Sequence, residues 1–256
     1  MSRPAALVTG ATSGIGAEFA RQLAGTHDLV LVARDETRLG RMRDELLAQG
    51  AEHAEVLAAD LTTDEGCAAV AERIGATERP VQVLVNNAGL GMYRAFGTAE
   101  LAAEERQLDL NVRAVMRLSH AAVRAMTARD HGLIINVSSI SAFVPRASNA
   151  TYSASKAWVT MFSEGLSVQL GGTGVHVCAI CPGFTRTEFH ERASADMQHV
   201  PERMWLAAPD VVREGLAGAF AGKPLVIPTR RYRTLVVASR IVPRAVLRRV
   251  IARRRY

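Results

Sequence analysis

The stretch AALVTGATSGIGAEFARQL, residues 5–23, decides the fold. Its apolar first five residues are typical of a buried strand, and the apolar spacing after residue 16 predicts a helix. Three glycines, Gly10, Gly14 and Gly16, lie between the two. Glycines let a backbone approach a pyrophosphate closely, and the free N–H groups and dipole of a helix N-terminus favour its negative charge. The stretch therefore predicts a strand, a phosphate-binding turn and a helix.

The chain up to residue 227 continues in the same rhythm of short apolar runs and amphipathic stretches. Further strands are expected at 28–33, about 55–59, about 81–86, 133–138, 175–181 and 225–227, and helices at about 36–49, about 63–77, about 101–128, 151–170 and near 209–221. Such alternation is typical of a doubly wound parallel sheet. We therefore expect a three-layer α/β Rossmann fold with a seven-stranded parallel sheet, in one domain spanning residues 1–228.

Charge sets residues 229–256 apart from this domain. The 256 residues are 48% hydrophobic and 22% charged, a balance typical of a globular protein. The net charge is +6, but residues 230–256 contain ten arginines and no acid, which leaves 21 basic and 25 acidic residues elsewhere. The basic character therefore belongs to the tail.

The tail is apolar from Leu235 to Val242, and after Pro243 apolar residues alternate with arginines in a helical pattern. We expect a basic amphipathic extension. Eight apolar residues cannot span a bilayer, but such a helix can lie on an anionic membrane surface. Packing on a second subunit and folding back over the substrate lid are the alternatives. Nucleic-acid binding is not expected, because no aromatic platform or base-reading motif accompanies the arginines.

The cysteines are Cys67, Cys178 and Cys181. The last two form a C-x-x-C within a strand-like apolar run, where they point to opposite faces. We interpret them as buried thiols and expect no metal site. No signal peptide and no run of 18 apolar residues is present, so we expect a cytoplasmic protein, with the tail as its candidate membrane-peripheral contact.

The stretch from Ser139 to Lys156 contains the residues for acid–base chemistry. If Tyr152 begins a helix, Lys156 lies one turn further on the same face. A phenol has an ordinary pKa of about 10, and a nearby ammonium lowers that pKa towards neutral pH. Lysine is rare here, since the chain has two lysines against 29 arginines. Together with a hydrogen bond from Ser139, these groups indicate proton transfer at a carbonyl or alcohol oxygen.

Polar and small residues follow the predicted strand ends, where ligands of such sheets bind. The second strand ends at Ala33-Arg34, in the place where an NAD site carries an acid for the ribose 2′-hydroxyl. A guanidinium there suits a 2′-phosphate, so NADP(H) is the preferred cofactor and NAD(H) the alternative. Asp60-Leu61 follow the third strand, where a carboxylate can meet an adenine amine. The run 86–89, Asn-Asn-Ala-Gly, follows the fourth.

Together these motifs resemble the short-chain dehydrogenase/reductase family over about residues 5–228. Five matches occur in order: Thr9-Gly10-x-x-x-Gly14-Ile15-Gly16, Asn86-Asn87-Ala88-Gly89, Asn111, Ser139 with Tyr152-x-x-x-Lys156, and Pro182-Gly183 with Thr187. Each match is modest by itself, but all five in this order and spacing are specific. The resemblance implies an NAD(P)-dependent oxidoreductase that binds a small carbonyl or alcohol substrate and forms a homodimer or homotetramer.

The resemblance also implies a role for each matching residue. Tyr152 would be the general acid in reduction and the base in oxidation, and Lys156 would hold the nicotinamide ribose and lower the tyrosine pKa. Ser139 would hydrogen-bond the substrate oxygen. Asn111, which alone indicates a buried hydrogen-bonding group, would distort its helix and complete a proton relay to Lys156 through water. The implied cofactor-binding set is Gly10, Thr12, Ser13, Gly14, Ile15, Gly16, Arg34, Asp60, Leu61, Asn87, Ala88, Gly89, Tyr152, Lys156, Pro182, Gly183, Thr185 and Thr187, with Asn86 beside Gly89 in the ribose wall.

Three loops, residues 90–98, 140–149 and 184–208, are expected to form the substrate pocket, the last as a lid. Their apolar and aromatic residues are Met92, Tyr93, Phe96, Phe143, Val144, Phe184, Phe189, Met197, Met204 and Trp205. An apolar pocket suits a lipophilic ketone, such as a 3-oxoacyl chain or a steroid-like ketone, although half of these side chains are expected to pack the lid onto the core. Arg146 and His190 could anchor a carboxylate or thioester head group, but we interpret them as surface residues.

The leading hypothesis is therefore an NADPH-dependent ketone reductase. One alternative is an NAD(P)-dependent alcohol dehydrogenase that works oxidatively. The other is a non-catalytic NADP(H)-binding sensor or scaffold, against which the complete set of Ser139, Tyr152 and Lys156 argues.

Overall fold

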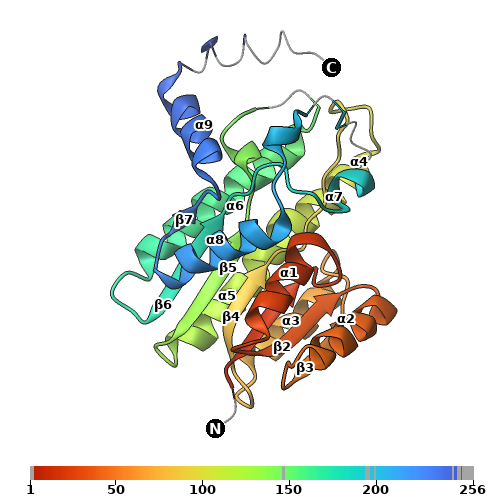
Figure 1. The fold of residues 1–256 in the computed structure, drawn as a ribbon, viewed down its shortest axis with the longest axis vertical. Helices are drawn as coiled ribbons and strands as arrows, with labels where there is room; N and C mark the ends of the chain where they lie inside the picture. The colour runs from red at the N-terminus through yellow and green to blue at the C-terminus, as the bar shows by residue number, and fades with distance from the viewer. Residues whose placement is uncertain are drawn as a thin grey trace.

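Seven parallel strands form one sheet in the computed structural model of the protein (Figure 1). The structure describes residues 3–145, 148–193, 197–198, 200–243, 245–246 and 249. The strands are β1 (Ala5–Thr9), β2 (Asp28–Ala33), β3 (Ala54–Ala58), β4 (Val81–Asn86), β5 (Gly132–Val137), β6 (Val175–Ile180) and β7 (Leu225–Val226). They lie in the order β3-β2-β1-β4-β5-β6-β7, so the direction of strand succession reverses between β1 and β4. The predicted seven-stranded parallel sheet is confirmed.

Helices cover both faces of the sheet, which completes the predicted three layers. One face carries α1 (Gly14–Leu23), α2 (Glu36–Ala48) and α8 (Ala208–Phe220), and the other carries α3 (Asp64–Gly75), α5 (Val115–Thr127) and α6 (Ala150–Gln169). Each face buries its own apolar cluster, one with Phe19 and Leu39, the other with Val70 and Leu118. Burial from both sides explains why the strands are almost continuously apolar.

The helix expected over about 101–128 is present but irregular. It consists of α4 (Leu101–Leu108), a π-helical segment (Asp109–Ala114) and α5. A π turn is wider than an α turn and accommodates an extra residue within an otherwise continuous helix. Asn111 lies in this segment, as the predicted helix distortion required.

The chain leaves the sheet at β7 and forms α9 (Arg230–Ile241), which stands at one end of the molecule beyond the two helical layers (Figure 1). Tyr232 and Val236 of α9 are buried, whereas Leu235, Val237 and Ile241 are exposed. The helical stretch predicted after Pro243 lies mostly outside the described residues. Within the described part of the chain, no helix combines the length and apolar character needed to cross a bilayer. The boundary between domain and extension at residue 228 stays a prediction.

Candidate active site

A cavity of about 690 Å³ opens at the carboxyl ends of the parallel strands. It is lined by residues that directly follow β1 to β6, which parallel strands bring to one edge of the sheet. Most of the predicted site residues line it: Gly10, Thr12, Ser13, Gly14, Ile15, Arg34, Asp60, Leu61, Asn87, Ala88, Gly89, Ser139, Tyr152, Lys156, Pro182, Gly183, Thr185 and Thr187. Gly16 and Asn111 lie behind this lining. The sequence motifs therefore converge on one cavity.

The glycine turn between β1 and α1 is tightly packed. Gly10 has a φ of 67°, in the left-handed region that side chains other than glycine rarely adopt. A Cβ at Gly16 would lie 2.2 Å from the carbonyl oxygen of Gly10, so that position has no room for a side chain. The two glycines let the strand turn sharply into the helix. Ser13 precedes α1 without a side-chain capping bond, which leaves the first N–H groups of α1 directed at the cavity end.

The hydroxyl of Thr9 joins this turn to the end of β4. It accepts hydrogen bonds from the backbone N–H of Asn87 (2.9 Å) and of Ala88 (3.0 Å) and donates to the carbonyl of Val85 (3.2 Å). The Asn87 side chain donates to the Thr9 carbonyl at 2.9 Å in return. Asn87 therefore holds two cavity walls together, and Thr9 is a positioning residue that the sequence reasoning missed.

Asn86, which the resemblance placed in the ribose wall, lies elsewhere. Its side chain is buried and donates to Asn136 (2.8 Å) and Ser119 (3.2 Å). Asn136 pairs with Asn86 across β4 and β5 and donates to Ser163 on α6 at 2.9 Å. Successive strand residues face opposite sides, so Asn86 points into the core while Asn87 reaches the turn. The Asn86 prediction was wrong.

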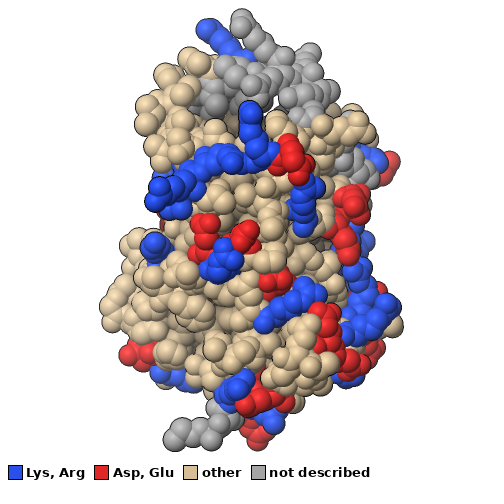
Figure 2. Space-filling view, in the orientation of Figure 1, with Lys and Arg blue, Asp and Glu red and all other residues tan. Residues whose placement is uncertain are grey.

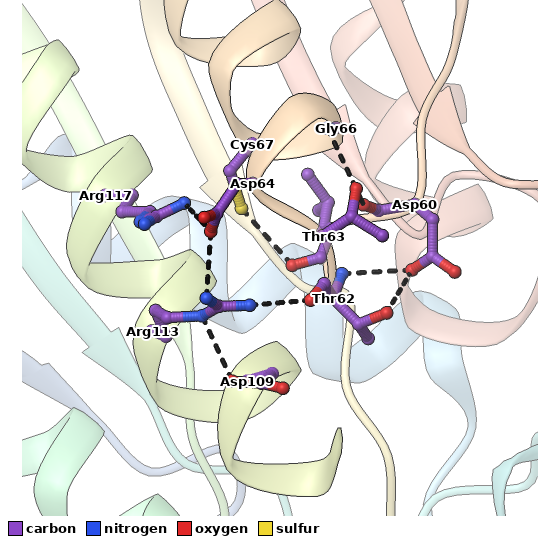
Figure 3. Close-up of polar contacts among 10 residues, drawn as sticks. Asp60, Thr62, Thr63, Asp64, Gly66, Cys67, Asp109, Arg113 and Arg117 are labelled. Atoms are coloured by element: carbon purple, nitrogen blue, oxygen red, sulfur yellow. Dashed lines mark hydrogen bonds and ion pairs between the residues drawn. The ribbon is translucent and has the colours of Figure 1, made fainter. Parts of the chain in front are cut away.

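A cluster of ion pairs supports the turn that follows β3 (Figure 3). Asp60 accepts hydrogen bonds from the N–H and hydroxyl of Thr62 at 3.0 and 2.8 Å. Arg113, in the π-helical segment, donates to the carbonyl of Thr62 at 2.6 Å and pairs with Asp64 at 2.9 Å (Figure 3). Burial alone raises the pKa of Asp60, but the Thr62 hydrogen bonds and the positive charges of Arg34 and Arg106 outweigh it and hold the pKa below its ordinary value. Asp60 is thus an ionised acceptor at the cavity edge.

A second arginine lies beside the predicted 2′-phosphate position. Arg38 on α2 lines the cavity with Arg34 and donates to the carbonyl of Thr12 at 3.4 Å. Its other partner is Glu188, at 3.0 and 3.2 Å, across the cavity mouth. The pKa of Glu188 is lowered, first by its hydrogen bond with Arg38. The sequence reasoning missed Arg38, although its position four residues after Arg34 at a helix start was a usable signal.

Tyr152 and Lys156 lie on the first turns of α6, as their spacing predicted, and both line the cavity with Ser139. The Lys156 Nζ atom lies 5.8 Å from the Tyr152 ring centroid and donates to the Val137 carbonyl at 2.9 Å. Burial lowers the pKa of Lys156 to about 8. Ser139 lies two residues after the end of β5, and its Oγ accepts from the N–H of Ser141 at 3.1 Å. These three residues therefore line the same cavity, whose part beside them is the candidate reaction centre.

Asn111 fixes the backbone next to that centre. Its Oδ1 accepts from the Leu90 N–H at 2.8 Å, and its Nδ2 donates to the Leu90 carbonyl at 2.8 Å and to Ser155 at 3.2 Å. A Cβ at Gly89 would lie 3.2 Å from Asn111 Oδ1 and 3.5 Å from Lys156 Nζ. The amide and the ammonium thus converge under Gly89. The relay through water stays a prediction.

Aromatic rings form the substrate side of the cavity. Tyr93, Phe184, Phe189 and His190 line it, and the Phe189 ring lies 5.7 Å from that of Tyr152. His190 was expected at the surface, but it is half-buried on the cavity wall. It contacts the rings of Tyr93, Phe184, Phe189 and, at 5.3 Å, Trp205. His190 belongs to the short helix α7 (Phe189–Arg192), whose first residue, Phe189, also lines the cavity.

Several other expected pocket residues do not line the cavity: Met92, Phe96, Phe143, Val144, Met197, Met204 and Trp205. Phe96 is 68% exposed. Trp205 packs behind Phe184 and His190, and the Met204 carbonyl accepts a hydrogen bond from Tyr232 of α9. Trp205 and Met204 therefore support the lid, as expected for part of this set. Arg146 lies outside the described residues.

The thiols take no part in the site. Cys67, Cys178 and Cys181 are free and buried, and burial raises the pKa of Cys178 to about 12 and that of Cys181 to about 11. They are therefore neutral at physiological pH, as the buried-thiol interpretation predicted. Among the described residues, no group of three or more histidine, cysteine, aspartate or glutamate side chains is placed to hold a metal ion.

The fold and the cavity at its strand ends are those of a dinucleotide-binding oxidoreductase. Residues 4–198 match the family model of the short chain dehydrogenases, and the chain belongs to this family. It is 42% identical over 192 residues to a putative ketoacyl reductase of Streptomyces coelicolor, covering 71% of this chain and 70% of that protein.

Two solved structures resemble the whole fold. A short-chain dehydrogenase of Sphingobium yanoikuyae in complex with NADPH has a TM-score of 0.85 and 34% identity, covering 93% of this chain and 94% of that one. A bulky-bulky ketone specific alcohol dehydrogenase of Comamonas testosteroni has a TM-score of 0.81 and 31% identity, covering 94% of this chain and 93% of that one. Both structures extend the likeness beyond residue 198.

Proposed function

We propose that the protein reduces a lipophilic ketone to a secondary alcohol with NADPH. The proposal rests on one observation: the candidate acid–base residues and the candidate cofactor-binding residues line the same cavity. Ser139, Tyr152 and Lys156 line it together with the glycine turn and Arg34. An NADPH-bound relative and a ketone-specific relative of the same fold support the choice.

The residues present fit this cofactor. Gly10 and Gly16 have no room for side chains, so the backbone of the turn stays open to a pyrophosphate, and the uncapped start of α1 offers it N–H groups. Arg34 and Arg38 suit a 2′-phosphate, and Asp60 suits an adenine amine. NADPH, when bound, supplies the hydride that reaches the carbonyl carbon.

The side chains supply the proton and stabilise the charge that develops on oxygen. Tyr152 donates its phenolic proton to the substrate oxygen. Lys156, with a pKa of about 8, is mostly protonated at neutral pH and stabilises the phenolate that remains. The Ser139 hydroxyl donates a hydrogen bond to the same substrate oxygen, where negative charge grows in the transition state.

The aromatic wall supports a bulky apolar substrate. Rings at Tyr93, Phe184, Phe189 and His190 surround the space beside Tyr152, with few charged groups to anchor a small polar molecule. Such a wall favours flat or branched apolar groups on both sides of a carbonyl.

Tyr152→Phe tests the assignment of the acid. The variant should lose about 100- to 10,000-fold in kcat, the range that general acid catalysis supplies, and keep its NADPH affinity within about twofold. The assay follows NADPH oxidation against ketones of graded size, from alkyl methyl ketones to diaryl ketones. Undiminished turnover would contradict the role of Tyr152. NADPH binding without turnover on any carbonyl or alcohol would instead support a non-catalytic sensor.

A homo-oligomer is part of the proposal. Met161 and Val168 on the outer side of α6 are 71% and 82% exposed, and a second copy would cover them. Light scattering on the eluted protein should give a dimer or tetramer mass, and Val168→Glu should lower it. A monomer mass for the unchanged protein would refute this part.

The tail supports a separate proposal of membrane-peripheral contact for a cytoplasmic protein. Val237 and Ile241 on α9 are 56% and 77% exposed, and residues 230–256 carry ten arginines and no acid. This differs from the rest of the face shown in Figure 2, where acidic and basic side chains are intermingled. The protein should sediment with vesicles containing phosphatidylserine and not with phosphatidylcholine alone, and Ile241→Glu should weaken that binding. Equal recovery with both vesicle types would exclude it.

A further inference from the structure

The hydroxyl of Tyr232 joins three separate segments. Tyr232 lies in the first turn of α9, outside the two helical layers, yet it is 0% exposed. Its oxygen accepts from the N–H of Phe184 at 3.2 Å and donates to the carbonyl of Met204 at 2.6 Å. Phe184 belongs to the loop after β6 that lines the cavity, and Met204 ends the 3-10 turn Glu202–Met204 of the lid.

The ring of Tyr232 packs directly on the same loop. A Cβ at Gly183 would lie 2.1 Å from two ring carbons, far inside contact distance. Gly183 does not have a positive φ, so space and not backbone conformation excludes a side chain there. The ring therefore sets how far the loop can lie from α9.

This loop is fixed from both sides. On the cavity side, Thr187 lies against Gly14, where a Cβ would be 2.9 Å from the threonine side chain. On the lid side, the Leu206 N–H donates to Phe184 at 2.8 Å, and the Arg186 N–H donates to Leu206 at 3.0 Å. Two short segments, 184–186 and 204–206, are thus joined by backbone hydrogen bonds. Tyr232 of α9 contacts both of them, one through Phe184 and the other through Met204.

A second contact of α9 reaches the loop after β5. The guanidinium of Arg240 lies 5.1 Å from the ring centroid of Phe143, which ends the turn that Ser139 begins. The helix therefore touches the two loops that border the reaction centre, the one after β5 and the one after β6.

We propose that Tyr232 is a positioning residue, through which the C-terminal helix holds the loop 182–187 in place over the cofactor cradle and ties it to the lid segment 202–206. The expected effect on cofactor kinetics rests on the proposed function, whereas the expected effect on the mobility of the loop does not. When Tyr232 loses its hydroxyl, the Phe184 N–H and the Met204 carbonyl lose a shared partner, and α9 contacts the loop through the ring alone. The nicotinamide end of the cofactor then has a less constrained wall.

Tyr232→Phe is the test variant, because it keeps the ring against Gly183 and removes only the hydroxyl. Val236→Ala is the matched control, since it removes a buried apolar contact of the same helix one turn beyond Tyr232 and leaves the Tyr232 ring and both hydroxyl bonds unaltered. Hydrogen–deuterium exchange of the full-length protein, without ligands, is measured on peptides covering 182–187 and 202–206. Steady-state kinetics and the primary deuterium isotope effect with 4-deuterated NADPH follow on the same samples.

Tyr232→Phe should exchange about three- to tenfold faster in both segments, the change expected for one lost hydrogen bond. Its kcat/KM for NADPH should fall by a similar factor with a larger isotope effect, while Val236→Ala lowers the melting temperature and changes neither. Unchanged exchange in Tyr232→Phe, or equal effects of the two variants, would overturn the proposal. Faster exchange in a protein that turns over no carbonyl would keep the positioning role and refute the proposed function instead.

Discussion

Arg34→Ala is the change that tests the cofactor preference most directly. Arg34 follows β2 and lines the cavity. It comes directly after Ala33, which stands at the position where an NAD site carries an acid. A hydrogen bond to a charged group contributes about 1.5–3 kcal/mol, and about 1.4 kcal/mol corresponds to tenfold in affinity. Arg34 is exposed, so water and salt screen its charge and favour the lower end of that range. We expect the NADPH Kd to rise about 10- to 30-fold and the NADH Kd by less than about twofold.

Arg38→Ala should have a smaller effect for a reason that the structure provides. Arg38 already pairs with Glu188 at 3.0 Å, so a 2′-phosphate would replace one anionic partner with another. We expect a rise of about two- to fivefold in the NADPH Kd, and a larger contribution from Arg38 in a Glu188→Gln background.

Fluorescence titration of NADPH and NADH at low and high salt measures both effects. Arg41→Ala is the matched control, because Arg41 lies on the same helix, exposed and away from the cavity. Higher salt should weaken the binding of NADPH more than that of NADH in the unchanged protein. In Arg34→Ala, the salt effects on the two cofactors should be more nearly equal. Equal losses of NADPH and NADH affinity in Arg34→Ala would refute the 2′-phosphate assignment.

Three further predictions concern the interior of the site. Folding lowers the pKa of Lys156 from 10.5 to about 8, so between those pH values the unfolded chain holds a proton that the folded one has released, and the free energy of unfolding rises with pH. Lys156→Met should therefore be inactive yet about 3 kcal/mol more stable at pH 7, with the difference gone by pH 10.5 in denaturant titrations. A variant less stable at pH 7 would contradict this. Asn111→Ala should cost about 2–3 kcal/mol, because the Leu90 N–H and carbonyl lose their partners, and proteolysis near Leu90 should accelerate, which an unaltered cleavage rate would disprove. Thr9→Val keeps the shape but removes the acceptor of the Ala88 N–H and leaves the Asn87 N–H with the Val85 carbonyl alone, so we expect a loss of about 1–2 kcal/mol by thermal melting and an altered NADPH Kd. A wild-type melting curve would count against this prediction.

The sheet and the reaction centre could be predicted from the sequence because local pattern encodes both. Short, continuously apolar runs that alternate with amphipathic helical stretches predict parallel strands. The carboxyl ends of parallel strands lie at the same edge of the sheet. The four-residue spacing of Tyr152 and Lys156 placed them on one helical face, and Ser139 had only to follow a strand. Short-range geometry was sufficient for these positions.

The remaining positions depended on contacts between distant segments. Asn86 and Asn87 are adjacent and identical in type, and only the exact end of β4 decides which one reaches the glycine turn. His190 faces the cavity because α7 packs against the loop after β6, and Tyr232 meets Phe184 across 48 residues of chain. The spacing of apolar and polar residues along one segment does not indicate which distant segment it will contact.

The wide turn at Asp109–Ala114 makes the helix between β4 and β5 one residue longer than a regular coil with the same ends would be. Deleting one residue there would restore uniform α geometry and improve the local backbone bonding. The two ends of the helix could then stay in place, but residues inside the segment would shift by one position, and each position corresponds to about 100° about the helix axis. Asn111 would then turn away from Leu90 and lose both of its hydrogen bonds to that residue. The irregular turn is therefore what directs Asn111 at Leu90.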